Sequence, residues 1–236
     1  MEVKQCTNCH QKLCLTKVPM FADLSQEELI QILNKIEHKA YEKGEIIFKE
    51  GSTSDVLYFI NTGSVKLYNY TKDGKEQILH VLSEGDFFGE LSLIKSAKHQ
   101  FYAKPIEDVN LCLLTKAEMT NIIMQNPEIG IKLLETLGKR LTAAERLAQN
   151  LATNDIDARL AYLLVSFLGD EINYDKMCTP LKVKLPLNRE EMANSIGVTR
   201  ETISRKLKKF EVEGLIELIG TKYIRILDCE GLKCYL

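Results

Sequence analysis

Long hydrophobic runs are absent from this chain of 236 residues. Its longest apolar stretches, such as Leu160–Leu168, are far too short to cross a bilayer, and the polar N-terminus has no apolar core of a signal peptide. Glycine and proline are scarce, with 13 and 5 residues, which excludes disordered and fibrous classes. The sequence therefore predicts a soluble protein of the cytoplasm with one large or two ordinary domains.

Neither sign of charge is in excess, since 31 Lys and Arg residues stand against 33 Asp and Glu residues. The whole-chain charge of −2 gives no support for nucleic-acid binding, so any basic patch must be local. Enzyme signatures are missing as well. The chain has no P-loop, dinucleotide-binding fingerprint or recognisable nucleophile–base pair, and we do not predict an enzyme.

Cysteine, in contrast, is plentiful. In a reducing cytoplasm an odd count of seven favours metal binding or redox chemistry over a disulfide framework. The opening stretch MEVKQCTNCHQKLC holds three of them, and read alone it allows zinc, a redox pair or no role at all. The seven are Cys6, Cys9, Cys14, Cys112, Cys178, Cys229 and Cys234.

The residue pattern of the N-terminal half changes from helical to β-prone near residue 40. Residues 20–37 have apolar positions at helical spacing, and Ser25 with Glu28 fits a capping box. From about 40 to 118, short β-prone runs alternate with turns that contain Gly or Asp. Several short strands at such spacing predict a sandwich or barrel-like β-domain.

A long helix is predicted over residues 127–152. Its apolar residues alternate steps of three and four, as in a coiled-coil seam of roughly two and a half heptads. A helix packed on its own domain is the alternative, but so narrow a seam favours a dimer contact. The predicted seam consists of Leu134, Leu137, Leu141, Ala144, Ala148 and Leu151.

The C-terminal part predicts a winged helix-turn-helix after a further helix at about 155–169. In LNREEMANSIGVTRETISRKLKKFEVEGLIELIGTKYIRIL, Asn188 and Glu191 cap one short helix, and Thr199 caps the next. Gly197 between them suits a turn with positive φ. The hairpin that follows turns at Gly220.

The second of these helices has a basic outward face. Residues 186–210 hold six Lys and Arg against three Glu, a local excess in an acidic chain. Arg can bridge guanine O6 and N7, Glu can accept from cytosine N4, Ser is adaptable, and lysines can meet phosphates. A solvated helix in a protein-binding winged helix is the alternative. The outward residues are Arg200, Glu201, Ser204, Arg205, Lys206, Lys208 and Lys209.

The segments DFFGELSLI and GVTRETISRKLKKFEVEGLIE together resemble the CRP/FNR family of bacterial transcription regulators, over residues 20–227. The resemblance implies an α+β fold: an N-terminal β-roll sensor domain like the cyclic-nucleotide-binding domain, a dimerisation helix and a C-terminal winged helix-turn-helix. It implies a homodimer that binds double-stranded DNA at an inverted repeat and contacts RNA polymerase. The expected parts are a cysteine-rich cluster-binding segment (1–19), the β-roll (20–126), the dimerisation helix (127–153) and the DNA-binding domain (154–236).

The resemblance also implies DNA-reading positions. Glu201, Ser204 and Arg205 match the E-x-x-S-R pattern of the FNR branch, and Arg200 is similar to the CRP branch. The resemblance therefore implies DNA half-sites similar to TTGA(T/C), arranged as an inverted repeat. The expected DNA-binding set is Thr199, Arg200, Glu201, Ser204, Arg205 and Lys208.

The cyclic-nucleotide members of the family surround the cyclic phosphate with a Gly-Glu pair and an Arg-Ser/Thr pair. Gly89 and Glu90 match the first pair, but His99 and Gln100 stand at the second. A neutral imidazole cannot replace a guanidinium that binds a phosphate bidentately. We therefore expect Gly89–Glu90 to be a structural turn and cyclic AMP not to be the effector.

The cysteines resemble the ligand set of the FNR branch, with Cys112 at the fourth-ligand position. The resemblance implies a [4Fe-4S] cluster held by Cys6, Cys9, Cys14 and Cys112, which senses oxygen or nitric oxide. The Cys9–Cys14 gap is one residue shorter than in the family pattern. Structural Zn²⁺ on the same cysteines, a thiol redox switch and an organic ligand in the β-roll are the alternatives.

Overall fold

The computed structural model describes residues 15–94, 98–152, 155–168 and 180–235, and the chain divides into two compact units. The first unit consists of residues 1–70 and 78–139, and the second of residues 71–77 and 140–236. Within the described ranges, no helix is long and apolar enough to span a membrane.

The first unit begins with two 3₁₀ turns, η1 (Leu15–Lys17) and η2 (Pro19–Phe21), followed by helix α1 (Gln26–Leu33). The predicted capping box is confirmed, since the Ser25 hydroxyl accepts from the Glu28 amide and the Glu28 carboxylate accepts from the Ser25 amide. The helix is shorter than predicted because this box begins it at Gln26 and Asn34 caps its end.

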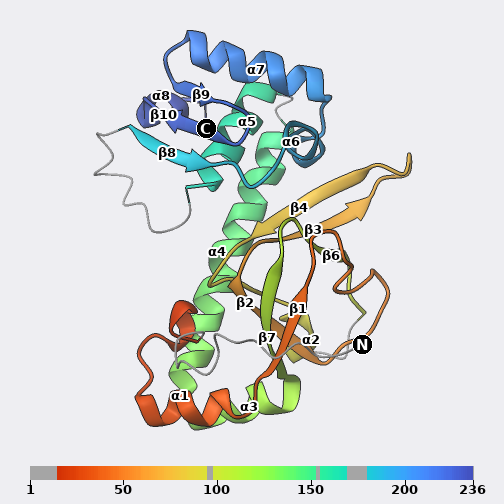
Figure 1. Cartoon of the computed structure of the whole chain (residues 1–236), viewed down its shortest axis with the longest axis vertical. Helices are drawn as coiled ribbons and strands as arrows, with labels where there is room; N and C mark the ends of the chain where they lie inside the picture. The colour runs from red at the N-terminus through yellow and green to blue at the C-terminus, as the bar shows by residue number, and fades with distance from the viewer. Residues whose placement is uncertain (1–14, 95–97, 153–154, 169–179, 236) are drawn as a thin grey trace. The chain divides into compact units, whose positions relative to one another are not determined.

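Antiparallel strands form the two sheets of the first unit (Figure 1), in the orders β1-β7-β2-β5 and β4-β3-β6. The predicted β-roll is therefore present, and a short helix α2 (Leu91–Ile94) follows β5. The strands are β1 (Glu37–Tyr41), β2 (Val56–Thr62), β3 (Val65–Tyr70), β4 (Glu76–Leu82), β5 (Phe87–Phe88), β6 (Tyr102–Pro105) and β7 (Val109–Thr115).

Strand β2 is buried on both faces because it separates two hydrophobic clusters. Its alternate side chains point to opposite sides. Leu57 and Phe59 join the cluster formed with η1, η2, α1 and the following helices, whereas Tyr58 and Ile60 join the cluster inside the roll. The β-domain thus has one core inside the roll and a second core between the roll and its helices. We call the second core the cluster beneath the roll.

Helix α3 (Lys116–Gln125) was not predicted, because the β-prone runs were expected to continue to about residue 118. The strand stops at Thr115, whose hydroxyl and Glu118 form a second capping box. Helix α4 (Pro127–Ala152) follows and confirms the predicted long helix. Ile129 and Leu133 anchor its first turns in the cluster beneath the roll.

The second unit is a winged helix-turn-helix, as predicted (Figure 1, blue). Its three-stranded sheet has the order β8-β10-β9, and β8 was not predicted. The helix predicted at 155–169 is shorter, with its C-cap at Phe167. The elements are α5 (Ile156–Ser166), β8 (Leu181–Lys184), α6 (Arg189–Ile196), α7 (Arg200–Val212), β9 (Ile216–Ile219), β10 (Tyr223–Ile226) and α8 (Cys229–Lys233).

Candidate functional site

The turn between α6 and α7 is built from local signals and one distant side chain. Asn188 and Glu191 cap α6, Gly197 ends it in the left-handed conformation at φ 72°, and the Thr199 hydroxyl accepts from the Thr202 amide at the start of α7. The guanidinium of Arg159, buried on α5, donates to the carbonyl oxygen of Ile196 at 2.8 Å. This bond satisfies an end carbonyl of α6 that the helix itself leaves without a partner.

Helix α7 is held by a fully buried stripe of Ile203, Leu207 and Phe210. This spacing places the opposite face in solvent. The exposed residues on that face are Arg200, Glu201, Ser204, Arg205 and Lys208. The structure therefore gathers the side chains selected for DNA reading, with the cap residue Thr199, on one surface of α7.

Several of these side chains already have partners within the unit. The Ser204 hydroxyl donates to the carbonyl oxygen of Arg200 at 3.1 Å. The backbone amide of Glu201 and the Thr199 hydroxyl lower the pKa of the Glu201 carboxyl, which keeps it ionised as an acceptor. Lys208 pairs with Glu211 at 2.6 Å.

The prediction that Lys206 and Lys209 face outward is wrong, because both are directed to Asp157 on helix α5 rather than to the exposed face of α7. Their amines lie 2.8 Å from the two carboxylate oxygens of Asp157, whose side chain is 12% exposed. Burial raises the pKa of Asp157, but the hydrogen bonds from the two lysines outweigh burial and lower it. Neither Asp157 nor Arg159 was selected from the sequence, because contacts across 37 or 52 residues leave no local pattern.

The predicted dimer seam on α4 is partly open in the single chain. Leu134 and Leu141 are 64% and 62% exposed, and Ala144 is exposed. Leu137 instead packs against the cluster beneath the roll. The side chains of Ala148 and Leu151 lie outside the described part of the structure.

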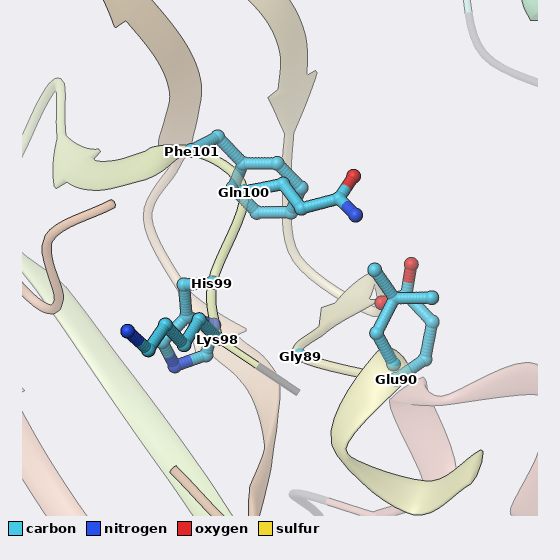
Figure 2. A pocket seen from close by; sticks show the side chains of 7 residues that line it. Gly89, Glu90, Lys98, His99, Gln100 and Phe101 are labelled. Carbon is cyan, nitrogen blue, oxygen red and sulfur yellow. The ribbon is translucent and has the colours of Figure 1, made fainter. Parts of the chain in front are cut away.

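A small pocket in the β-roll lies between the Gly89–Glu90 turn and the segment Lys98–Phe101, where the Lys98 amine points away from Glu90 (Figure 2). Gly89 has φ 87°, and a Cβ there would lie 2.7 Å from the Val56 carbonyl oxygen, so this turn requires glycine. His99 is only 9% exposed, and burial lowers its pKa. The pocket therefore offers a neutral imidazole where a bound phosphate would need a cation.

Cys112 is buried in the centre of β7, with 2% of its surface exposed. Its sulfur lies 3.5 Å from Nδ1 of His38, its direct cross-strand partner on β1. The same hydrophobic cluster contains Leu15 and Val18, so the chain just after Cys14 packs in the core that holds Cys112. A thiol beside an imidazole is a donor pair that zinc accepts, whereas the thiol alone is the donor that a [4Fe-4S] cluster takes.

The remaining cysteines are separate from Cys112. Cys6, Cys9, Cys14 and Cys178 lie outside the described residues. In the second unit Cys229 is buried, which raises the pKa of its thiol, and Cys234 is exposed. Among the described residues, no three metal-binding side chains come together.

Comparisons with known proteins agree with both units. Residues 38–126 match the family model of the cyclic nucleotide-binding domain, and residues 158–235 match that of the Crp-like helix-turn-helix domain. The chain is 31% identical over 184 residues to the cAMP-activated global transcriptional regulator CRP of Pasteurella multocida, over 78% of this chain and 86% of that protein.

Two further relatives cover more of the chain. The probable transcriptional regulator flp of Lacticaseibacillus casei is 29% identical over 220 residues, which are 93% of this chain and 96% of that protein. The solved structure of a CRP/FNR-family transcriptional regulator from Thermus thermophilus aligns with a TM-score of 0.64 and 26% identity. That alignment covers 84% of this chain and 97% of the other.

Proposed function

We propose that this chain, which belongs to the CRP/FNR family of transcription regulators, acts as a homodimer that reads an inverted repeat in DNA with helix α7. Regulators of this family bind DNA and are typically dimers. The observation that carries the proposal is the exposed row of Arg200, Glu201, Ser204 and Arg205 opposite a fully buried stripe. The charged and polar groups of that row match base edges in the major groove.

The dimer contact is assigned to α4. Leu134 and Leu141 lie seven residues apart and present exposed leucine side chains, which is the arrangement of a coiled-coil seam. Two α7 helices one DNA turn apart would read the two half-sites, with RNA polymerase as the further partner.

For the effector we propose a [4Fe-4S] cluster held by Cys6, Cys9, Cys14 and Cys112. The burial of Cys112 and the packing of Leu15 and Val18 support this assignment, because the chain after Cys14 is anchored in the same hydrophobic cluster as the fourth thiol. When bound, such a cluster supplies an iron centre that reacts with oxygen or nitric oxide.

The hydrophobic cluster beneath the roll links this thiol to the helix with the seam. It contains Cys112 and Leu15 together with Ile129 and Leu133 of α4, and Leu137 packs against it. Anchoring the N-terminal segment at Cys112 would favour one packing of the start of α4, and releasing it would favour another. A differential free energy of about 5 kcal/mol is enough to invert such a two-state population.

Structural zinc is the second candidate, and the contact between Cys112 and His38 favours it specifically. Zinc accepts mixed sulfur and imidazole ligands, whereas a cluster of this type is held by thiolates. In either case the neutral His99 argues against cyclic AMP as the effector.

Anaerobic purification of the full chain tests the effector. We expect about four irons and four sulfides per chain and a broad absorption that bleaches in air. One zinc without iron or sulfide would support the second candidate instead. Selection from random duplexes tests the DNA assignment, with an inverted repeat of TTGA-like half-sites as the expected outcome.

A further inference from the structure

The recognition helix α7 carries five cationic side chains, but the unit itself pairs three of them. Lys208 meets Glu211 on α7, whereas Lys206 and Lys209 both reach the single carboxylate of Asp157 on α5. Arg200 and Arg205 remain on the exposed face with Ser204 between them. Arg200 and Arg205, which suit base edges, are thus exposed to a bound DNA. Lys206 and Lys209, which suit phosphates, are instead paired with Asp157.

We propose that Asp157 limits the sequence-independent affinity of the chain for DNA, because it withholds Lys206 and Lys209 from the phosphate backbone. The inference rests on the proposed entry of α7 into the major groove. Phosphate contacts attract every DNA sequence equally, whereas base contacts discriminate. When fewer lysines of a recognition helix bind phosphates, base contacts supply a larger share of its binding free energy.

The geometry shows why one carboxylate holds both amines. Lys206 and Lys209 are three residues apart, so they lie on one flank of α7. The Lys206 amine lies 2.8 Å from Oδ1 and the Lys209 amine 2.8 Å from Oδ2, so each oxygen serves one lysine. Asp157 is itself fixed, since its backbone amide donates to the capping carboxylate of Asp155 at 2.8 Å.

The side chains of Lys206 and Lys209 are held by Asp157 but remain partly exposed to solvent. Their side chains are 23% and 40% exposed, against 12% for Asp157. Removing the acceptor would therefore free both amines to swing toward a nearby phosphate without unpacking the core. Lys209 has further neighbours in Glu213 at 3.6 Å and the ring of Tyr235, so Lys206 is the more completely released.

The test is Asp157→Asn in the full chain, with binding measured between about 50 and 200 mM salt. Two duplexes of equal length are compared: one with the inverted repeat obtained by selection and one with a scrambled sequence. Each released lysine is expected to steepen the salt dependence on scrambled DNA by about 0.9 in log K against log salt, for up to two lysines per protomer. Because phosphate contacts attract every sequence alike, the affinity for both duplexes should rise on the order of tenfold at low salt, and the ratio of the two affinities should stay that of the native chain.

Two further variants serve as controls. Glu230→Gln on α8 makes the same charge change and removes a partner of Lys233. Because Lys233 is on α8 and not on the recognition helix, this variant should keep the salt slope of the native chain. Asp157→Asn combined with Lys206→Gln and Lys209→Gln removes all three charges of this contact, and Glu213 keeps its hydrogen bond from the Tyr235 hydroxyl. It should return to the native slope, and it also serves if the single variant does not fold.

Distinct outcomes identify which idea is wrong. A native slope and a native affinity for scrambled DNA in Asp157→Asn would overturn the role of Asp157. A slope shallower than native in the triple variant would also overturn it, because the lysines would then contact phosphate in the native protein. Equal affinity of the native chain for the selected and scrambled duplexes would instead count against the proposed base reading by α7.

Discussion

The imidazole of His99 lies flat against the ring of Phe48, with the ring centroids 3.6 Å apart and the planes 8° from parallel. The stack belongs to the aromatic core of the roll, where Phe48 also meets Tyr58 and Phe88. His99 is therefore used for packing, and burial lowers its pKa so that it stays neutral. A neutral stacked ring has no charge with which to hold a phosphate.

Cyclic AMP should consequently leave the chain unchanged. A ligand at a hundred times its dissociation constant stabilises a protein by about 2.7 kcal/mol, which raises the melting temperature by several degrees. We expect no shift with cyclic AMP in a thermal unfolding experiment on the chain. A clear rise in melting temperature would restore the nucleotide as a candidate effector.

Replacing Cys112 by Ser should abolish retention of iron and sulfide in anaerobically purified protein. The substitution removes the one thiol of the proposed set that lies in the described core. Cys234→Ser is the matched control, because Cys234 is exposed in the other unit, and it should retain the full metal content. Full iron retention in Cys112→Ser would remove Cys112 from the ligand set.

Arg205→Ala should relax discrimination at one base pair of the half-site by about 1–3 kcal/mol. The reason is that Arg205 is exposed on the reading face of α7 and has the bidentate geometry that guanine requires. Competition binding with single-base variants of the selected site measures this effect. Lys208→Gln is the contrast, with an expected uniform loss over all sequences, and the same uniform loss for Arg205→Ala would make it a phosphate contact.

Leu134→Glu with Leu141→Glu should convert the dimer to monomer. Burying a leucine is worth about 1.5–3 kcal/mol, so replacing both on each protomer weakens association by several orders of magnitude. Sedimentation velocity distinguishes the two states. Met124→Glu on α3 is the control, since Met124 is 79% exposed and off the seam. A variant that remains dimeric would place the contact elsewhere.

The stability of the second unit should fall in acid through Asp157. Its pKa is lowered in the folded chain, so the unfolded chain binds the proton more readily and stability rises with pH. The contribution is complete above the ordinary carboxyl pKa of about 4 and is lost as pH falls through the lowered value. Urea unfolding from about pH 7 to about pH 2 should show a loss of about 1–3 kcal/mol that is absent in Asp157→Asn. Parallel curves for both proteins would contradict this assignment.

The elements that the sequence predicted correctly have short-range causes. The boxes at Ser25 and Asn188 and the cap at Thr199 join residues three apart, and the stripe of Ile203, Leu207 and Phe210 follows the helical period. Helix α3 was missed although Thr115 and Glu118 carry the same signal. Because α3 follows strand β7 without an intervening loop, the sequence pattern does not mark where the strand ends and the helix begins.

The sequence by itself determined the two-part architecture, the recognition helix and five of the seven residues expected on its outer face, because periodicity and capping act within a few residues. Only the tertiary structure decided that His38 meets Cys112, that Phe48 covers His99 and that Asp157 takes two lysines from α7. These partners are 74, 51 and about 50 residues apart, and no local pattern records which strand or helix will pack beside another. Long-range packing therefore decides which charges on the DNA-reading helix are available to the ligand.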